Sequence, residues 1–436
     1  MSTHTIHTAE QALERLGSLP GGPELLERAT LHDGVALVGG AVRDLLLGHW
    51  PRELDVTVSS DVAGLAQELA ASVSPSERAY GHAVAPVLHE RFGTASVAWE
   101  YGRIDIAERR AESYPAPGAL PLVRPGTVEE DLARRDFTVN AIALPLAGRE
   151  RGRLLSVDGA VEDLAAGTLR VLHEQSFRDD PTRLLRLARY AARLGFEIEP
   201  RTRELAVAAV AGGAPETVSG GRLGSELWLA VKEEDGRAAL RALDSLGVPD
   251  ALGMASPFDD DLAREAEALL PADGSRAVLL MGVVMHPDDD TDVEPADVME
   301  RLEFSRDQTR EVLGASAGAD PLAELILRAA EEGVPPSLDL HGPEAVAVAG
   351  ALAARRAPAA REVVRSWFAN HRHVRLEIDG SDLLAAGVPQ GPEVGARLLV
   401  ALRRKREGRS SDREQELHAA LEGEFQHDSA IGTGEP

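Results

Sequence analysis

The chain of 436 residues contains no cysteine, which excludes disulfide bridges, thiolate zinc sites and thiol nucleophiles. It also lacks any run of about 18 apolar residues, the length that a membrane-spanning helix requires. The first residues show neither the basic start nor the apolar stretch of a secretory signal. We therefore expect a cytoplasmic protein with no membrane segment.

Positive charge is scarce: the net charge is −26, and lysine occurs only at positions 232 and 405. Most of the acidity lies in residues 251–350, which hold 22 acidic and 6 basic side chains. Residues 101–200, by contrast, hold 16 acidic and 15 basic side chains. Since nearly all cations are arginines, whose planar groups suit bidentate phosphate binding, a nucleic-acid partner is not excluded by the net charge.

Hydrophobic periodicity predicts an α+β protein with a strand-containing head and a long helical remainder. We expect a helix and linker in residues 1–30, a head of mixed sheet and helices in 31–150, a helical neck in 151–250, and a helical body and tail in 251–436. Strands are predicted at 35–38, 53–58, 84–89, 95–100 and 103–107. Helices are predicted at 9–19, 41–48, 62–71, 178–195, 200–211, 222–231, 237–246, 262–270 and 361–371, with a linker at 286–295 and a solvated tail at 424–436.

Two carboxylates share one face of a predicted strand. Glu53 and Asp55 are two residues apart, so both side chains point the same way. Such a pair suits Mg²⁺, which takes one or two carboxylates together with substrate phosphates. If the strand carrying Asp105 is a neighbour, the three acids are placed to hold two metal ions for phosphoryl transfer. An isolated pair of this kind is also common on a solvent-facing strand.

A glycine turn precedes this strand. Gly39 and Gly40 follow an apolar run and open a short helix. Glycine lets the backbone approach a ligand closely, and the N–H groups that begin a helix favour a phosphate. The order of glycine turn, helix and carboxylate strand therefore predicts a triphosphate beside its metal ions.

Several longer segments carry a resemblance to a known family. The residues 39–44 (GGAVRD) with 53–55 (ELD), together with 131–141 (DLARRDFTVNA), 158–164 and 177–186 (FRDDPTRLLR), resemble the signatures of class II tRNA nucleotidyltransferases and bacterial poly(A) polymerases. A weaker similarity covers 379–392. The resemblance implies a head of the DNA-polymerase-β-like nucleotidyltransferase kind.

The residue patterns and the resemblance together predict roles for individual residues. Glu53, Asp55 and Asp105 would be catalytic, the first two as Mg²⁺ ligands, and the nucleotide would be bound by Gly39, Gly40, Arg43, Arg135, Asp136, Asn140, Asp179, Asp180, Arg183, Arg186 and Arg189. An aspartate acceptor with an arginine donor matches the amine and ring nitrogen of both cytosine and adenine, whereas uracil and guanine reverse that pattern. From sequence alone, Asp180 is equally a helix cap with Arg183 as its ion-pair partner.

Arginines 183, 186, 189 and 193 fall on one helical arc, where we expect some to contact phosphate or RNA. The sequence departs from the family at three positions: Glu53 replaces the more usual aspartate, Asp179 the usual glutamate, and Gly221 a glutamate before Arg222.

We therefore expect an enzyme that adds CMP and AMP from CTP and ATP to the 3′ end of tRNA and has no membrane partner. The sequence makes no prediction of the oligomeric state. Alternatives are an A-adding enzyme, a CC-adding enzyme, a poly(A) polymerase and a catalytically silent RNA-binding protein. The resemblance implies that CC-adding enzymes lack a loop like residues 114–121, which disfavours that alternative.

Overall fold

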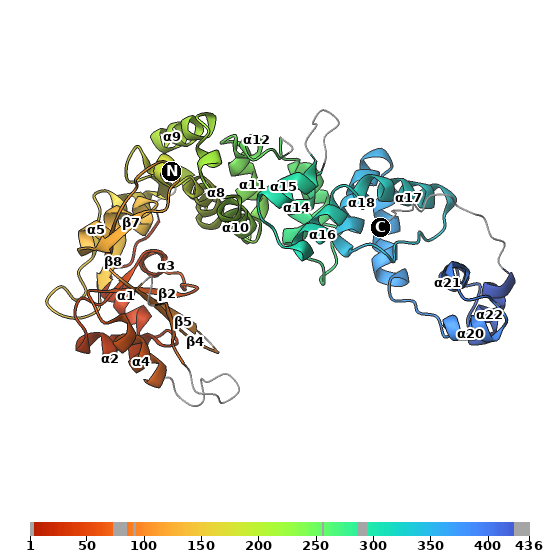
Figure 1. Ribbon diagram of the computed structural model, residues 1–436, viewed down its shortest axis with the longest axis horizontal. Helices are drawn as coiled ribbons and strands as arrows, with labels where there is room; N and C mark the ends of the chain where they lie inside the picture. Colours follow the sequence, from red (N-terminus) through yellow and green to blue (C-terminus); the bar gives the residue numbers. More distant parts are fainter. Residues whose placement is uncertain are drawn as a thin grey trace. The chain divides into compact units, whose positions relative to one another are not determined.

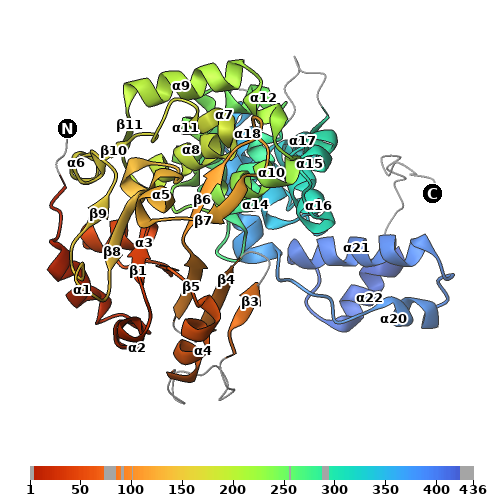
Figure 2. The same cartoon turned by 60° about the vertical axis from the view of Figure 1, so that its left-hand side comes forward.

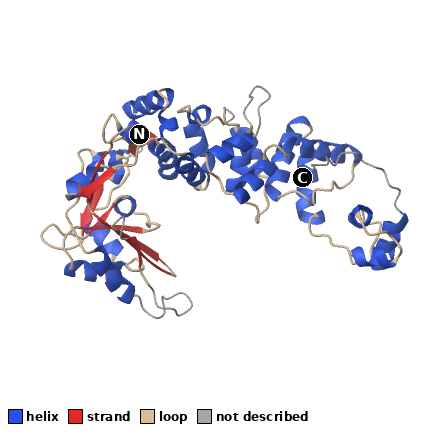
Figure 3. Cartoon of the chain, viewed as in Figure 1, coloured by secondary structure: helices blue, strands red, loops and turns tan. Residues whose placement is uncertain are grey.

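The computed structural model describes residues 4–72, 85–89, 93–100, 102–254, 257–286 and 294–422. The chain forms two compact units: one of Met1–Gly253 with Arg301–Glu303, the other of Met254–Glu300 with Phe304–Pro436. Within the described residues, the strands lie in the first unit and the second is helical (Figure 3). No helix of this described part is both long and apolar enough to cross a membrane.

The first unit is built on a seven-stranded mixed sheet with the order β3-β4-β5-β2-β1-β8-β9. Its only parallel pair among the described strands joins β2 to β5, and the other neighbours are antiparallel. The strands are β1 (Ala36–Val38), β2 (Leu54–Val58), β3 (Val87–His89), β4 (Thr94–Trp99), β5 (Gly102–Glu108), β8 (Ile142–Pro145) and β9 (Leu155–Ser156). The predicted mixed sheet is confirmed.

Helices α3 (Gly40–Leu46) and α4 (Val62–Ser72) pack against this sheet, α3 on β1 and β8 and α4 on β4 and β5 (Figure 2). Their apolar residues, Val42, Leu45 and Leu65 among them, are fully buried. Each such side chain contributes about 1.5–3 kcal/mol by leaving water. The head also contains α1 (Ala9–Leu16), α2 (Gly22–Arg28), α5 (Val128–Ala133) and the two-stranded hairpin β6 (Arg110–Ser113) with β7 (Leu122–Pro125).

Helical elements follow from residue 160 onward (Figure 1). In the first unit these are α6 (Ala160–Ala166), α7 (Ser176–Asp179), α8 (Thr182–Leu194), α9 (Pro200–Ala211), α10 (Gly220–Val231), α11 (Gly236–Asp244) and α12 (Val248–Ala251), with a small parallel pair β10 (Thr168–Leu169) and β11 (Glu197–Ile198). Helix α8 packs against both α10 and α11. This packing sets α8 and α10 side by side along the site described below.

The second unit holds α13 (Asp260–Glu267), α14 (Arg276–Val284), α15 (Pro295–Arg301), α16 (Arg306–Ala315), α17 (Ala319–Glu332), α18 (Pro343–Arg356), α19 (Ala360–Ser366), α20 (Gly380–Ala385), α21 (Pro392–Arg406) and α22 (Arg413–Glu422). The last three helices enclose a separate apolar cluster that includes Leu383 and Ala401. Arg406 of α21 connects these helices to the preceding part of the chain. It donates hydrogen bonds to Asp339 and to the carbonyl of His371, and it stacks over the ring of Trp367.

Two predicted helices differ from those observed. The helix predicted at 178–195 is interrupted, because Pro181 has no N–H and biases Asp180 toward its extended backbone (φ −136°, ψ 94°). The segment predicted as a helix over 361–371 changes to a π-helical turn at Trp367–His371. Several elements were not predicted individually, namely helices α2, α5, α6, α12, α14–α18 and α20–α22 and strands β6–β11. The predicted tail 424–436 lies outside the described residues, as does most of the 286–295 linker.

Candidate active site

A cavity of about 950 Å³ opens in the first unit where the sheet meets α8 and α10. Its wall combines segments far apart in the sequence: the glycine turn, β2, the β6–β7 hairpin, the segment 134–140, helices α8 and α10, and Glu303. Nine of the predicted site residues line it: Gly39, Gly40, Asp55, Arg135, Asp136, Asn140, Asp180, Arg183 and Arg186. Chain topology thus brings most of the predicted set together.

The strand predicted at 53–58 is observed as β2 (Leu54–Val58), so Asp55 lies on the strand whereas Glu53 lies just before it. Asp55 on β2 stands directly opposite Asp105 on the parallel strand β5, and Glu53 precedes β2 at an exposed position. Burial, followed by the negative charges of Glu53 and Asp105, raises the pKa of Asp55 to about 6. Asp105 accepts hydrogen bonds from Ser96 and from Arg103, whose Nε lies 2.8 Å from Asp105 Oδ2.

This donor set fits a hard divalent cation, because burial and the negative charges of Glu53 and Asp105 raise the pKa of Asp55, and a cation would relieve that repulsion. Among the described residues, no three acidic or histidine side chains are already gathered into a metal-binding cluster. The carboxylate oxygen atoms of Asp55, which lines the cavity, and of Glu53, which lies just before the same strand, are nonetheless the ligand type that Mg²⁺ takes when phosphates complete its shell.

The backbone geometry of the turn requires glycine at position 39. Gly39 adopts φ 68° and ψ −134°, a conformation open to glycine, and a Cβ there would lie 2.6 Å from Nη1 of Arg135. Arg135 donates to Asp131 at 3.0 Å, and its charge partly offsets the proton affinity of Asp55. The bare backbone at Gly39 therefore makes room for this guanidinium at the cavity wall.

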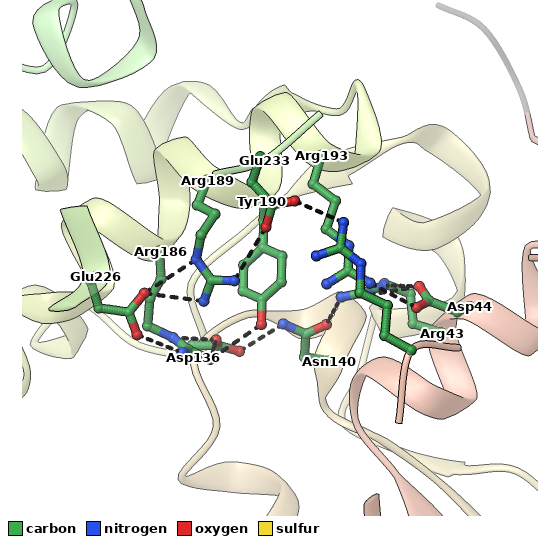
Figure 4. A network of polar contacts seen from close by, with 11 residues as sticks. Arg43, Asp44, Asp136, Asn140, Arg186, Arg189, Tyr190, Arg193, Glu226 and Glu233 are labelled. Atoms are coloured by element: carbon green, nitrogen blue, oxygen red, sulfur yellow. Dashed lines mark hydrogen bonds and ion pairs between the residues drawn. The ribbon is translucent and has the colours of Figure 1, made fainter. Parts of the chain in front are cut away.

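A chain of polar contacts links several residues that line the cavity (Figure 4). Arg43, which is 1% exposed, donates to Asn140 Oδ1 at 2.6 Å, and Asn140 Nδ2 donates to Asp136 Oδ1 at 2.9 Å. Arg186 then donates to Asp136 Oδ2 from Nε at 3.0 Å and from Nη2 at 2.6 Å. Although burial opposes ionisation, Arg186 and Asn140 lower the pKa of Asp136 to about 2. Asp136 is thus a fixed anion at neutral pH.

The arginine arc on α8 faces protein carboxylates. Arg186 and Arg189 both pair with Glu226 on α10, at 3.0 and 3.1 Å, and Arg189, 8% exposed, also lies 3.5 Å from Glu233. Arg193 pairs with Asp44 at 3.2 Å. The helical spacing therefore marks an internal ion-pair network, in which these three guanidiniums already have partners, rather than a free basic surface.

Asp180 and Arg183 both reach the cavity, but they do not pair with each other as the sequence alone suggested. Asp180 Oδ1 accepts from the N–H and hydroxyl of Thr182 and from Arg222 at 3.0 Å. Arg183, 4% exposed, donates to the Arg134 carbonyl at 2.8 Å. Asp179 instead lines a smaller, adjoining cavity of about 350 Å³ beside His173, and Arg183 lines both cavities. The two neighbouring aspartates thus face different spaces.

The hairpin contributes residues that the sequence analysis did not single out as site residues. Glu112 accepts from Arg110, Arg134 and the hydroxyl of Tyr114, and burial raises the pKa of that phenol to about 12. Tyr114 opens the Pro/Gly-rich segment noted above, which was the one available signal. Glu226 and Arg222 were likewise missed as partners, because nothing in a helix's own spacing reveals what faces it.

A fold of this kind, with a carboxylate pair beside a polar cavity, defines a nucleotidyltransferase class of protein. The poly(A) polymerase head domain family matches residues 35–170. A CC-adding tRNA nucleotidyltransferase of Deinococcus radiodurans is 33% identical over 414 residues, 90% of each chain. An A-adding tRNA nucleotidyltransferase of Geobacter sulfurreducens is 30% identical over 408 residues, 89% of this chain but 45% of that relative.

Among solved structures, a CCA-adding enzyme described in complex with CTP has a TM-score of 0.75 and 25% identity, covering 96% of this chain and 99% of its own. This chain belongs to the class II tRNA nucleotidyltransferase family. It spans about half the length, or less, of the first curated relatives that it matches.

Proposed function

We propose that the protein is a CCA-adding tRNA nucleotidyltransferase, which transfers CMP and AMP from CTP and ATP to the 3′ end of tRNA in the cytoplasm. The observation that carries the proposal is a single cavity lined by Asp55 at one place and by Asp180 and Arg183 at another. The first residue suits metal-assisted phosphoryl transfer, and the other two suit recognition of a base.

In the proposed reaction the tRNA 3′-hydroxyl attacks the α-phosphate and pyrophosphate leaves. Glu53 and Asp55, with Asp105 opposite, would hold Mg²⁺, which when bound lowers the pKa of the attacking hydroxyl and offsets charge on the phosphate. Arg135 lies beside the glycine turn, where its guanidinium would hold a phosphate oxygen. Burial, together with the negative charges of Glu53 and Asp105, raises the pKa of Asp55, and this supports a cation at this place.

Base selection is assigned to Asp180 and Arg183. Arg183 is buried and held by a main-chain carbonyl, so its remaining donors have a fixed direction. A fixed acceptor and donor pair accepts cytosine or adenine and leaves buried groups unpaired with uracil or guanine, which costs roughly 1–3 kcal/mol per group. No nucleic-acid template is then needed.

We assign the network of Arg43, Asn140, Asp136, Arg186 and Glu226 to positioning. Asp136 and Asn140 face the cavity, and their orientation is fixed by the buried Arg43 and by Arg186, which also lines the cavity. Arg186 and Arg189 would thus act through carboxylates and not by direct phosphate contact, because Asp136, Glu226 and Glu233 occupy them.

The test offers purified protein three tRNAs that end before CCA, after the first C and after both Cs, with CTP and ATP separately and together. Full CCA synthesis on the shortest tRNA is the expected result. Two relatives carry the names of A-adding and CC-adding enzymes, so addition of A alone, or of two Cs alone, would identify those narrower activities. Long A tails on unrelated RNA would identify a poly(A) polymerase.

A further inference from the structure

Three glycines on α10 accommodate a segment distant in sequence. An added Cβ would lie 1.6 Å from the carbonyl oxygen of Arg301 at Gly220, and 2.2 Å from that of Leu302 at Gly224. At Gly221 it would lie 2.6 Å from the carboxylate of Glu303. The segment Arg301–Glu303, which belongs to the first compact unit, therefore rests directly on the α10 backbone.

Glu303 has an unfavourable backbone. Its φ is +56°, and Asp61 is the other non-glycine residue with positive φ among the described residues. Glu303 follows the end of α15, where Phe304 N donates to the Met299 carbonyl, a position that glycine or asparagine usually fills. Since glycine would serve the turn better, the turn itself does not explain a glutamate here.

The side chain of Glu303 lines the nucleotide cavity. It is exposed, and it makes no hydrogen bond or ion pair with any residue in the described part of the chain. It lies against Gly221, next to Arg222, whose guanidinium binds Asp180 at 3.0 Å. Glu303 therefore presents an unpartnered carboxylate close to the residues assigned to base recognition.

The charge of Glu303 narrows what it can bind. A carboxylate accepts hydrogen bonds and repels phosphates, so a nucleotide would approach it with its base or sugar. Arg222, which follows Gly221, holds Asp180, one of the residues assigned to base recognition. The base of the nucleotide is therefore expected to lie nearer to Glu303 than the sugar does. We propose that Glu303 is a specificity residue that accepts a hydrogen bond from the exocyclic amine of bound CTP or ATP. This inference rests on the proposed function for the presence of a nucleotide in the cavity.

The experiment measures equilibrium binding of CTP, ATP, UTP and dCTP to the full-length protein and to its Glu303→Gln and Glu303→Gly variants. We expect the Kd of CTP and ATP to rise about tenfold, as for loss of one charge-assisted hydrogen bond, with UTP binding unchanged or tighter. Asp61→Gly is the matched control, because it relieves the other positive-φ residue and should leave all four Kd values unaltered. The melting temperature of Glu303→Gly should equal or exceed that of wild type, which separates lost binding from misfolding.

A second pair of variants tests the contact with α10. Gly221→Ala should push the carboxylate aside and weaken CTP binding, and it should have no further effect in the Glu303→Gly background. Additive effects would contradict this coupling.

The proposal would be overturned if the Glu303 substitutions changed the Kd of CTP and UTP equally, or changed neither. It would also be overturned if they changed the Kd of CTP but not that of dCTP, or if the wild-type protein did not bind CTP. Nucleotide incorporation, measured in parallel, distinguishes the two proposals. If the wild-type protein incorporates nucleotides and the Glu303 variants bind them as well as wild type does, only the role of Glu303 is contradicted. If the wild-type protein binds CTP through Glu303 but incorporates no nucleotide, only the proposed reaction is contradicted.

Discussion

Replacing Arg186 by methionine tests the buried network most directly. Asp136, which is 7% exposed, would lose both hydrogen bonds from Arg186 and keep those from Asn140 and from the N–H of Phe137. A pKa lowered from 3.8 to about 2 corresponds to roughly 2 kcal/mol. Breaking a fully buried pair costs about 3–5 kcal/mol. Because the side chain of Arg186 is 30% exposed, we expect a loss of about 2–3 kcal/mol.

The measurement is urea unfolding followed by tryptophan fluorescence, since Trp50, Trp99 and Trp228 all belong to the first unit. The control is Arg201→Met, which removes an exposed arginine (side chain 55% exposed) from ion pairs with Glu174 and Glu204 and should leave the free energy of unfolding nearly unchanged, because water and salt screen exposed pairs. Similar losses in the two variants would refute the reasoning. In the Asp136→Asn background, Arg186→Met should cost clearly less.

The network also predicts a dependence on pH. The folded-state pKa of Asp136 is depressed, so its contribution is fully present above the unfolded value of 3.8 and is lost as pH falls toward about 2. The stability difference between wild type and Arg186→Met should therefore be constant from pH 7 to 5 and shrink below pH 4. A difference that begins to fall near pH 6 would assign the effect to another group.

Three further outcomes are expected. Asp55→Asn should abolish incorporation, at least 1,000-fold by analogy with loss of one catalytic group, while tRNA affinity measured by filter binding stays within about twofold; retained incorporation would remove Asp55 from the metal site. Arg183→Ala should reduce the preference for CTP and ATP over UTP and GTP in competition assays by roughly tenfold or more, and unchanged selectivity would refute its role. Gly39→Ala should lower both the melting temperature and the affinity for CTP; the control Gly148→Ala has a similar φ of +74° but no atom within 4 Å of an added Cβ, and an equal effect there would show backbone strain alone at work.

Local pattern was enough to predict the carboxylate strand. Alternation placed Glu53 and Asp55 on one face, and the later alternating run supplied Asp105, which the parallel register sets opposite Asp55. The family resemblance carried the remaining cavity residues, because eleven matched positions around Asp136 are far more specific than two bare arginines. The mixed sheet followed from the same strands.

The predictions that were wrong concerned side chains whose contacts are made with residues distant in sequence. The spacing of Arg186, Arg189 and Arg193 gave one helical face correctly, yet the spacing of α8 says nothing of Glu226 on α10 or of Glu233 just beyond the end of α10. Asp179 and Asp180 were treated as one motif, but the extended backbone at Asp180 turns the two side chains into different cavities. Proline at 181 was the signal for that break, and the apolar period of the helix outweighed it in the prediction.

The seating of Arg301–Glu303 on α10 has a consequence for how the protein is made. The first unit takes in these three residues, and the chain between Gly253 and Arg301 belongs to the other unit. At typical translation speeds, the ribosome needs roughly 3–10 s to pass from residue 253 to residue 303. During that interval the glycine face of α10 is bare, and the nascent head holds a cavity that lacks one wall. The cavity proposed for the nucleotide gains Glu303 only after part of the second unit has been synthesised, so a fragment ending at Gly253 lacks one of the residues that line this cavity in the whole chain.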